Sequence, residues 1–226
     1  GLLFAGAAIG VSHLVQSTRA GADFGFGLLW AMLLVNLFKY PFFQFGPRYA
    51  AATGESLIDG YKRLGSWVLV AYFVLTLLTM FTIQAAVTIV TAGLASNLFG
   101  ITDNIGLWSS IITLVSLGIL LIGKYKLLDN LMKVIITILA LSTIGAVTAA
   151  ILNTTEHYSL LPGIPKGAVE IAFLIAFLGW MPAALDVSIW HSLWAIEKKK
   201  VKSESFSTSG ALFDFNVGYV ATVFLG

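Results

Sequence analysis

The chain has 226 residues, of which 58% are hydrophobic and 11% are charged, and its net charge at pH 7 is +2. Its mean hydropathy of +0.91 excludes a water-soluble globular domain, in which about a quarter of the residues are charged. The absence of cysteine excludes disulfides and thiolate metal sites in this chain. Because apolar stretches of the length that a helix needs to cross a bilayer recur along the sequence, we expect an all-α multipass membrane protein.

The apolar residues form six segments and the start of a seventh. Their predicted bounds are 1–22, 26–49, 67–98, 107–122, 128–152, 171–194 and 211–225. The chain begins and ends inside apolar runs. We therefore expect residues 1–226 to form one transmembrane transporter domain that is truncated at both ends, with more helices in the complete protein.

Basic residues are concentrated in alternate loops. They follow the second, fourth and sixth segments: Arg48, Lys62 and Arg63; Lys124 and Lys126; and the lysines of 198–202. By the positive-inside rule, these loops and the N-terminus are cytoplasmic, and we expect a bacterial inner membrane protein with the lipid bilayer as its main partner. The lysine cluster then indicates topology, and no nucleic-acid partner is expected.

The sixth segment is interrupted by Gly179-Trp180-Met181-Pro182, and Asp186 lies just past the interruption. Pro182 has no N–H and its ring clashes with the preceding turn, so the helix must unwind or kink there. In hydrocarbon, freed carbonyls and a carboxylate are tolerated only where they face protein or a water-filled cavity. The interruption predicts a binding site at membrane depth, and the alternative is a proline kink in a purely structural helix.

The first segment is also interrupted, near Gly10. Polar side chains crowd into the turns that follow: Ser12, His13, Gln16, Ser17, Thr18, Arg19 and Asp23. So polar a stretch cannot face lipid. For His13 two interpretations stay open, a neutral imidazole bonded to a backbone carbonyl and a ligand or proton carrier, whereas Arg19 and Asp23 are expected to pair. Interrupted segments that lie five apart are typical of inverted-repeat transporters, which bind substrates between their broken helices.

Lys39 lies well inside the second segment, beside a polar stripe formed by Asn36, Tyr40 and Gln44. A buried ammonium is costly unless its side chain reaches the membrane interface or finds a partner. The two alternatives for Lys39 are therefore the cytoplasmic interface and a nearby carboxylate, for which Asp186 is a candidate.

Two further side chains are candidates for the transport pathway. Gln84 shares a face of the third segment with Thr88 and Thr91, a pattern found both in helix packing and along pathways. Met181 offers a thioether, which suits transition metals, although many buried methionines only fill gaps. No nucleophile, base and orienting group are visible together, so we do not expect an enzyme.

Several motifs resemble the Nramp (natural resistance-associated macrophage protein) family of divalent metal transporters. They occur in matching order and spacing over the whole chain: Ala20–Trp30, Ala51-Ala-Thr-Gly54, Asn97-Leu-Phe-Gly100 and Met181-Pro182. The resemblance implies a LeuT-like fold of two inverted five-helix repeats with discontinuous helices 1 and 6. The present chain would then hold helices 1 to 6 and the start of helix 7.

The chain departs from the family pattern at the expected metal site. The family's Asp-Pro-Gly-Asn falls on residues 10–13, which here read Gly-Val-Ser-His, so both oxygen ligands of that motif are missing. The histidine of the family's Met-Pro-His falls on Ala183. The acidic pair that the family associates with proton movement falls on Gln84 and Val87.

We expect a secondary transporter for a divalent metal ion such as Mn²⁺ or Fe²⁺, which works by alternating access with proton coupling. The predicted metal ligands are His13, Met181 and Asp186, and Ser12 and Gln16 are expected to line the substrate site beside them. Pathway or gating roles are predicted for three other residues: Lys39, Gln84 and Pro182.

Asp186 is the candidate coupling carboxylate, because removing a carboxylate from water favours its protonated form. The metal would be the substrate, and no cofactor is expected. One alternative is an ion-coupled transporter of an organic anion or a metal chelate, because Lys39 and Arg19 lie in the same neighbourhood. Another is a scaffold or sensor that transports nothing.

Overall fold

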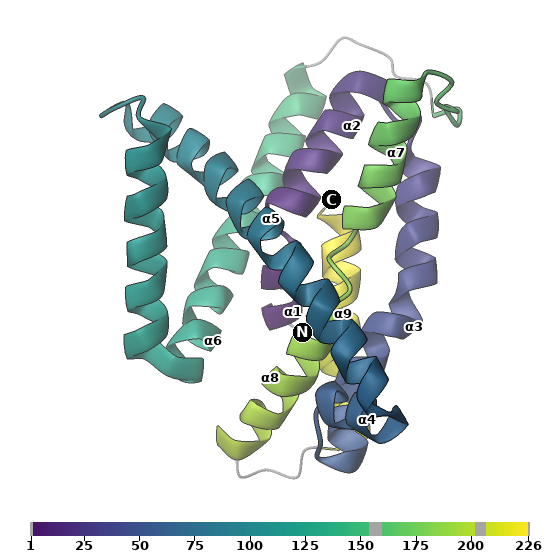
Figure 1. Ribbon diagram of the computed structural model, residues 1–226. Helices are drawn as coiled ribbons and strands as arrows, with labels where there is room; N and C mark the ends of the chain where they lie inside the picture. The colour runs from purple at the N-terminus through teal and green to yellow at the C-terminus, as the bar shows by residue number, and fades with distance from the viewer. Residues whose placement is uncertain (1, 154–159, 202–206, 226) are drawn as a thin grey trace. The chain divides into compact units, whose positions relative to one another are not determined.

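The computed structural model describes residues 2–153, 160–201 and 207–225; at 2, 11, 12, 124–126 and 201 only the backbone belongs to this description (Figure 1). The regular elements of these residues are all helices. They are α1 (Leu2–Ala8), the π-helix η1 (Val11–Val15), α2 (Gln16–Phe24), α3 (Leu29–Thr53), α4 (Leu57–Leu64), α5 (Ser66–Phe99), α6 (Ile105–Asn153), α7 (Ala168–Trp180), α8 (Val187–Val201) and α9 (Thr208–Phe224). The chain divides into two compact units, residues 1–57 with 132–226, and residues 58–131.

Both predicted interruptions are present in the first unit. α1 ends at Ala8, and Gly10 has an extended backbone before η1 begins. α7 ends at Trp180, Met181 is extended, and α8 begins only at Val187. The expected discontinuous first and sixth helices are therefore confirmed.

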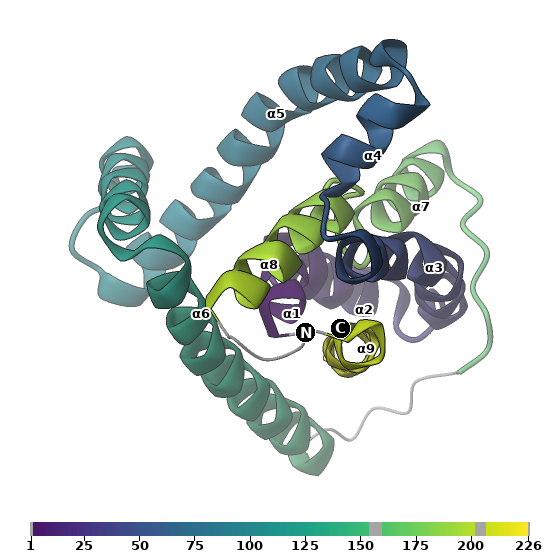
Figure 2. The ribbon, with the colours of Figure 1, turned by 90° about the horizontal axis from the view of Figure 1, so that it is seen from below.

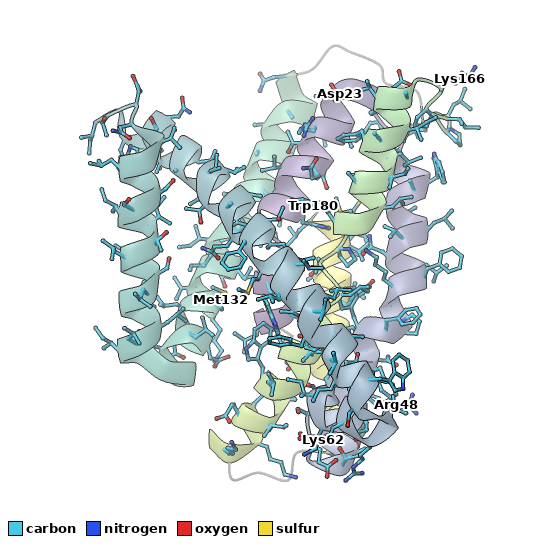
Figure 3. All side chains as sticks on the ribbon, in the orientation of Figure 1. Asp23, Arg48, Lys62, Met132, Lys166 and Trp180 are labelled. Atoms are coloured by element: carbon cyan, nitrogen blue, oxygen red, sulfur yellow. The ribbon has the colours of Figure 1, made fainter. Side chains whose placement is uncertain are left out.

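The interruption after α7 lies between the two ends of the first unit. Figure 3 shows Asp23 and Lys166 at one end of this unit and Arg48 at the other, with Trp180 between them. The helix therefore breaks in the interior of this unit and not at one of its ends, as the position of Pro182 in the sequence predicts.

α3 contacts both parts of the broken sixth helix. It packs against α8 and α9, and it touches α7; Figure 2 shows α9 beside α3 and α1. The close approach to α8 occurs at Gly46, where a Cβ atom would collide with the backbone carbonyl oxygen of Ser188. The hydroxyl of Ser188 donates to the carbonyl of Phe42 at 2.9 Å. The close packing of α3 and α8 therefore depends on the absence of a side chain at Gly46 and on a hydrogen bond from Ser188.

Aromatic side chains form the core around α1. Phe4 lies 5.4 Å from Phe43, 5.3 Å from Phe215 and 5.5 Å from Tyr219, measured between ring centroids. These separations are typical of favourable aromatic pairs. The cluster packs α1 against α3 and α9, directly before the first interruption in the chain.

The second unit contains α4, α5 and the first part of α6. α5 is a 34-residue apolar helix that ends at Phe99, and Gly100, which follows it, has a left-handed φ of 61°. The connection between the fourth and fifth predicted segments is a bend with helical backbone and not the predicted loop, because α6 is assigned as helix from Ile105 to Asn153. At Gly123 an added Cβ atom would lie 2.5 Å from the Cβ of Leu127, much closer than side chains four residues apart lie in a straight helix, so α6 bends sharply at this glycine (Figure 1).

Three stretches in the described residues are long and apolar enough to cross a membrane: Ser66–Phe99, Ile105–Gly123 and Leu127–Asn153. The last two are the parts of α6 on either side of residues 124–126. They match the third, fourth and fifth predicted segments. The number of spanning stretches in this region is therefore as the sequence predicts, although two of them are joined by a bent helix and not by a loop.

Candidate functional site

The ammonium group of Lys39 caps the C-terminal end of α7. Its Nζ donates hydrogen bonds to the backbone carbonyls of Leu178 at 2.9 Å, Gly179 at 2.8 Å and Met181 at 2.7 Å. In a continuous helix the carbonyl of Leu178 would accept from residue 182, which is a proline without an N–H. The lysine therefore satisfies carbonyls that the interruption leaves free, at a helix end that carries partial negative charge.

This arrangement corrects the expectation of a carboxylate partner for Lys39. The side chain bonds to backbone carbonyls beside the α7 interruption, and its partner is not the carboxylate of Asp186. The position of Lys39 in the sequence predicts that its ammonium needs a partner, and that partner is a set of carbonyls instead of a carboxylate. The signal for the true partner was Pro182, which guarantees a free carbonyl four residues earlier.

The side chain of Met181 lies in an apolar cluster. It is fully buried against residues of α3 and α7 that include Met32, Val35 and Phe177. Pro182 follows it and is also fully buried. The Met181 thioether is thus positioned beside the interruption, with a second thioether, that of Met32, in the same cluster.

His13 is fully buried and bonded to α9. Its Nε2 lies 2.7 Å from the carbonyl oxygen of Thr222, so Nε2 carries the proton and donates it. Its Nδ1 then holds a lone pair, and this buried atom has no hydrogen-bond partner. The imidazole is therefore bonded to a backbone carbonyl, as one interpretation predicted, while one nitrogen stays available as an acceptor or a metal ligand.

α9 supplies polar neighbours of the α3 stripe that the sequence did not indicate. The hydroxyl of Tyr219 donates to the carbonyl of Asn36 at 2.6 Å, and the hydroxyl of Tyr40 donates to Oδ1 of Asn216 at 2.8 Å. The predicted stripe on α3 therefore faces polar residues of α9, to which Gln44 also donates. The signal was an i, i+3 spacing of polar residues inside the seventh apolar segment.

A second buried acceptor lies on the same stripe. Asn36 is only 3% exposed, and its amide nitrogen donates to the carbonyl of Met32 at 2.8 Å. Its Oδ1 is buried without a hydrogen-bond partner. Since Tyr219 and Thr222 are one turn apart on α9, the residues that they contact, Asn36 and His13, are held by adjacent turns of one helix.

The structure describes the contacts of two further polar residues, Gln84 and Arg19. Gln84 lies exposed in the second unit and donates to Thr88 within α5 at 3.1 Å. The guanidinium of Arg19 lies over the ring of Phe173, 5.4 Å from its centroid, and is not paired with Asp23.

The other predicted residues lie at or near the interruptions. Gln16 is half-buried at the start of α2, and Asp186 is half-buried just before α8. The backbone of Ser12 lies in η1, but its side chain is outside the described residues. Within the described part of the chain, no three His, Asp or Glu side chains converge, so a bound metal would need thioether, amide or backbone ligands.

Two discontinuous helices that meet polar side chains of α3 and α9 define the class of this protein: a multipass helical membrane protein with the LeuT-like arrangement. Residues 1–224 match the family described as "Natural resistance-associated macrophage protein-like". The chain belongs to this family, Nramp, which is a family of membrane transporters for divalent metal ions and not of enzymes.

A curated relative supports the assignment. The chain is 36% identical over 229 residues to "Uncharacterized protein PM0681" of Pasteurella multocida (strain Pm70). The alignment covers 100% of this chain and 52% of that protein, so the chain spans about half the length of the curated relative that it matches. No solved structure matches the chain.

Proposed function

We propose that the protein is a secondary transporter that moves a divalent metal ion of the Mn²⁺ or Fe²⁺ type by alternating access about its two helix interruptions. The observation that carries this proposal is the buried Nδ1 of His13, which has a lone pair and no partner beside the first interruption. Imidazole nitrogen and thioether sulfur are ligands that suit transition metals. Membership of the Nramp family agrees with this substrate class.

The proposed ligands are His13, Met181 and Asp186. Ser12 and Gln16 complete the proposed substrate site, and Oδ1 of Asn36 adds an oxygen acceptor on α3. Pro182 fixes the end of α7, so a gating movement would pivot on the unwound residues between α7 and α8.

Proton coupling is assigned to Asp186 in this proposal. Its carboxylate is half-buried at the unwound segment, and partial removal from water favours the protonated form. A carboxylate that binds a metal ion when it is ionised and releases the ion when it is protonated links the movement of the metal to the movement of a proton.

A second candidate function is the transport of an organic anion or a metal chelate. The contact of Lys39 with the end of α7 favours it, because this ammonium adds positive charge at the same interruption. A negatively charged group is attracted to such a site, and a bare dication is repelled. Both candidates use the same two interruptions and differ in the charge of the transported species.

The experiment that tests the proposal is uptake by the full-length protein in proteoliposomes. Radioactive Mn²⁺, free or as a citrate complex, and citrate alone are offered to the wild-type protein and to His13→Ala. The first candidate predicts uptake of free Mn²⁺ that falls about tenfold or more in His13→Ala. Uptake of citrate or its complex without free Mn²⁺ would support the second candidate, and no uptake of any solute by folded protein would contradict both.

A further inference from the structure

We infer that the ammonium group of Lys39 takes the place of a bound cation at the end of α7. There it determines specificity, because it keeps bare divalent cations away from the carbonyls of α7. This inference rests on the proposed function, because it concerns what the transport site accepts. It starts from the three carbonyl oxygens that converge on one nitrogen, at 2.7 to 2.9 Å. Three convergent backbone oxygens at an unwound helix end form the kind of environment that binds cations.

The ammonium group saturates this environment. It has three N–H donors, and the three carbonyls of Leu178, Gly179 and Met181 use all of them. No carboxylate takes part in this contact. The charge of Lys39 therefore compensates the negative end of the α7 dipole, as a bound metal ion would otherwise do.

A dication that approached these oxygens would have to displace the lysine. It would also experience repulsion from the ammonium, which is strong in surroundings that are partly shielded from water. The displaced ammonium would lose three hydrogen bonds at membrane depth, where few alternatives exist. Both effects disfavour a bare dication at the end of α7.

The position of Lys39 also limits what the site can accept. A metal ion must either use side-chain ligands such as Nδ1 of His13, away from the carbonyls, or arrive with negatively charged ligands of its own. Since the three N–H donors of Lys39 are already occupied, an anionic ligand would gain charge attraction from it without a new hydrogen bond. Lys39 is thus a specificity-determining residue for the charge of the substrate.

Equilibrium binding of Mn²⁺ to the full-length protein in lipid nanodiscs tests this inference. The variants are Lys39→Met and Lys39→Gln, which remove the charge, and Lys39→Arg, which keeps it. Lys62→Met, on α4 in the other compact unit, is the matched control. We expect the two neutral variants to bind Mn²⁺ about tenfold or more tightly than the wild type, while Lys39→Arg and Lys62→Met bind as the wild type does.

The inference is overturned if the folded neutral variants bind Mn²⁺ no more tightly than the wild type, or if Lys39→Arg gains as much as they do. The amide of a glutamine can still donate to two of the carbonyls. Lys39→Gln therefore allows the same binding measurement if Lys39→Met does not fold. A third measurement uses only the wild-type protein. Excess Mn²⁺ should leave the rate at which Lys39 is acylated unchanged, and faster acylation would show that the ion displaces the ammonium.

These measurements are independent of transport. If no solute is taken up by proteoliposomes but the neutral variants gain Mn²⁺ affinity, the proposed function fails and the role of Lys39 stands. If wild-type uptake of Mn²⁺ is observed and the neutral variants show no gain in binding, the role of Lys39 fails and the proposed function stands.

Discussion

The hydroxyl of Tyr219 in α9 lies 2.6 Å from the backbone carbonyl oxygen of Asn36 in α3, to which it donates a hydrogen bond. Both residues are buried. One turn further along α9, the carbonyl of Thr222 accepts from His13. α9 therefore links the polar stripe of α3 to the first interruption, and the acceptors that it leaves free, Nδ1 of His13 and Oδ1 of Asn36, are positioned by the same helix.

Tyr219→Phe removes this link without changing the aromatic core. The ring contacts with Phe4 and Phe215 are retained, and only the hydroxyl is lost. We expect the free energy of unfolding to fall by about 1 kcal/mol, the net worth of one buried hydrogen bond. The measurement is reversible unfolding of the full-length protein in mixed micelles. Tyr72→Phe, whose ring contact with Tyr61 is likewise kept, is the control, and an equal loss in both variants would contradict the role of the link.

The interruptions could be predicted from the sequence because their causes are local. Pro182 acts on the turn that precedes it, and the polar run after Gly10 cannot face lipid. The same reasoning does not apply to every proline, since Pro41 and Pro47 lie inside the continuous helix α3. The helical backbone of the bend in α6 could not be predicted, because the lysines between its two apolar parts indicate a change of topology without specifying the backbone there.

The partners within the site could not be predicted, because they depend on packing between distant segments. Lys39 contacts residues about 140 positions away, and His13 contacts a residue 209 positions away. Residue chemistry shows that a buried lysine needs oxygen partners, but carbonyls and carboxylates both satisfy that need. The roles of His13, Met181 and Asp186 in metal binding stay predictions, which the experiments above address.

Gly46→Ala tests the close crossing of α3 and α8. A Cβ atom at this position would collide with the carbonyl oxygen of Ser188, which is backbone and cannot rotate away. We expect the two helices to separate and the free energy of unfolding to fall by about 1 to 3 kcal/mol. Gly93→Ala in α5 is the matched control, because nothing lies within 4 Å of its added Cβ. There the substitution should be neutral or slightly stabilising, and a loss at Gly93 as large as that at Gly46 would argue against the steric explanation.

Glu170→Ala tests the start of α7. The backbone amide of Lys166 donates to the Glu170 carboxylate at 2.9 Å and that of Gly167 at 3.3 Å, and these bonds lower the pKa of Glu170 below its ordinary value of 4.5. A lowered folded-state pKa means that the stabilisation is present above the unfolded-state pKa and is lost as the pH falls through the folded-state pKa.

The expected result is a frayed first turn of α7 in Glu170→Ala at neutral pH, and in the wild type only at acid pH. The amide chemical shifts of Lys166 and Gly167, followed by NMR from about pH 6 to about pH 3, report it. In Glu170→Gln the side-chain oxygen can still accept these bonds without titrating, so its shifts should stay constant over that range. Wild-type shifts that do not change with pH would be incompatible with a carboxylate cap.

Asp186→Asn tests the proposed coupling. The substitution keeps the size of the side chain and one oxygen acceptor, but it removes the group that can exchange a proton. If Asp186 couples metal and proton movement, the variant should still bind substrate weakly, and uptake should lose its dependence on an imposed pH gradient, with a rate reduced about tenfold or more. Asp23→Asn is the matched control, because Asp23 is an exposed carboxylate on α2 outside the interruption.

The measurement is uptake by the full-length protein in proteoliposomes with an inward proton gradient, before and after the gradient is collapsed with a protonophore. The coupling role is excluded if the protonophore slows the Asn variant as much as it slows the wild type, because the proton path would then not pass through this carboxylate.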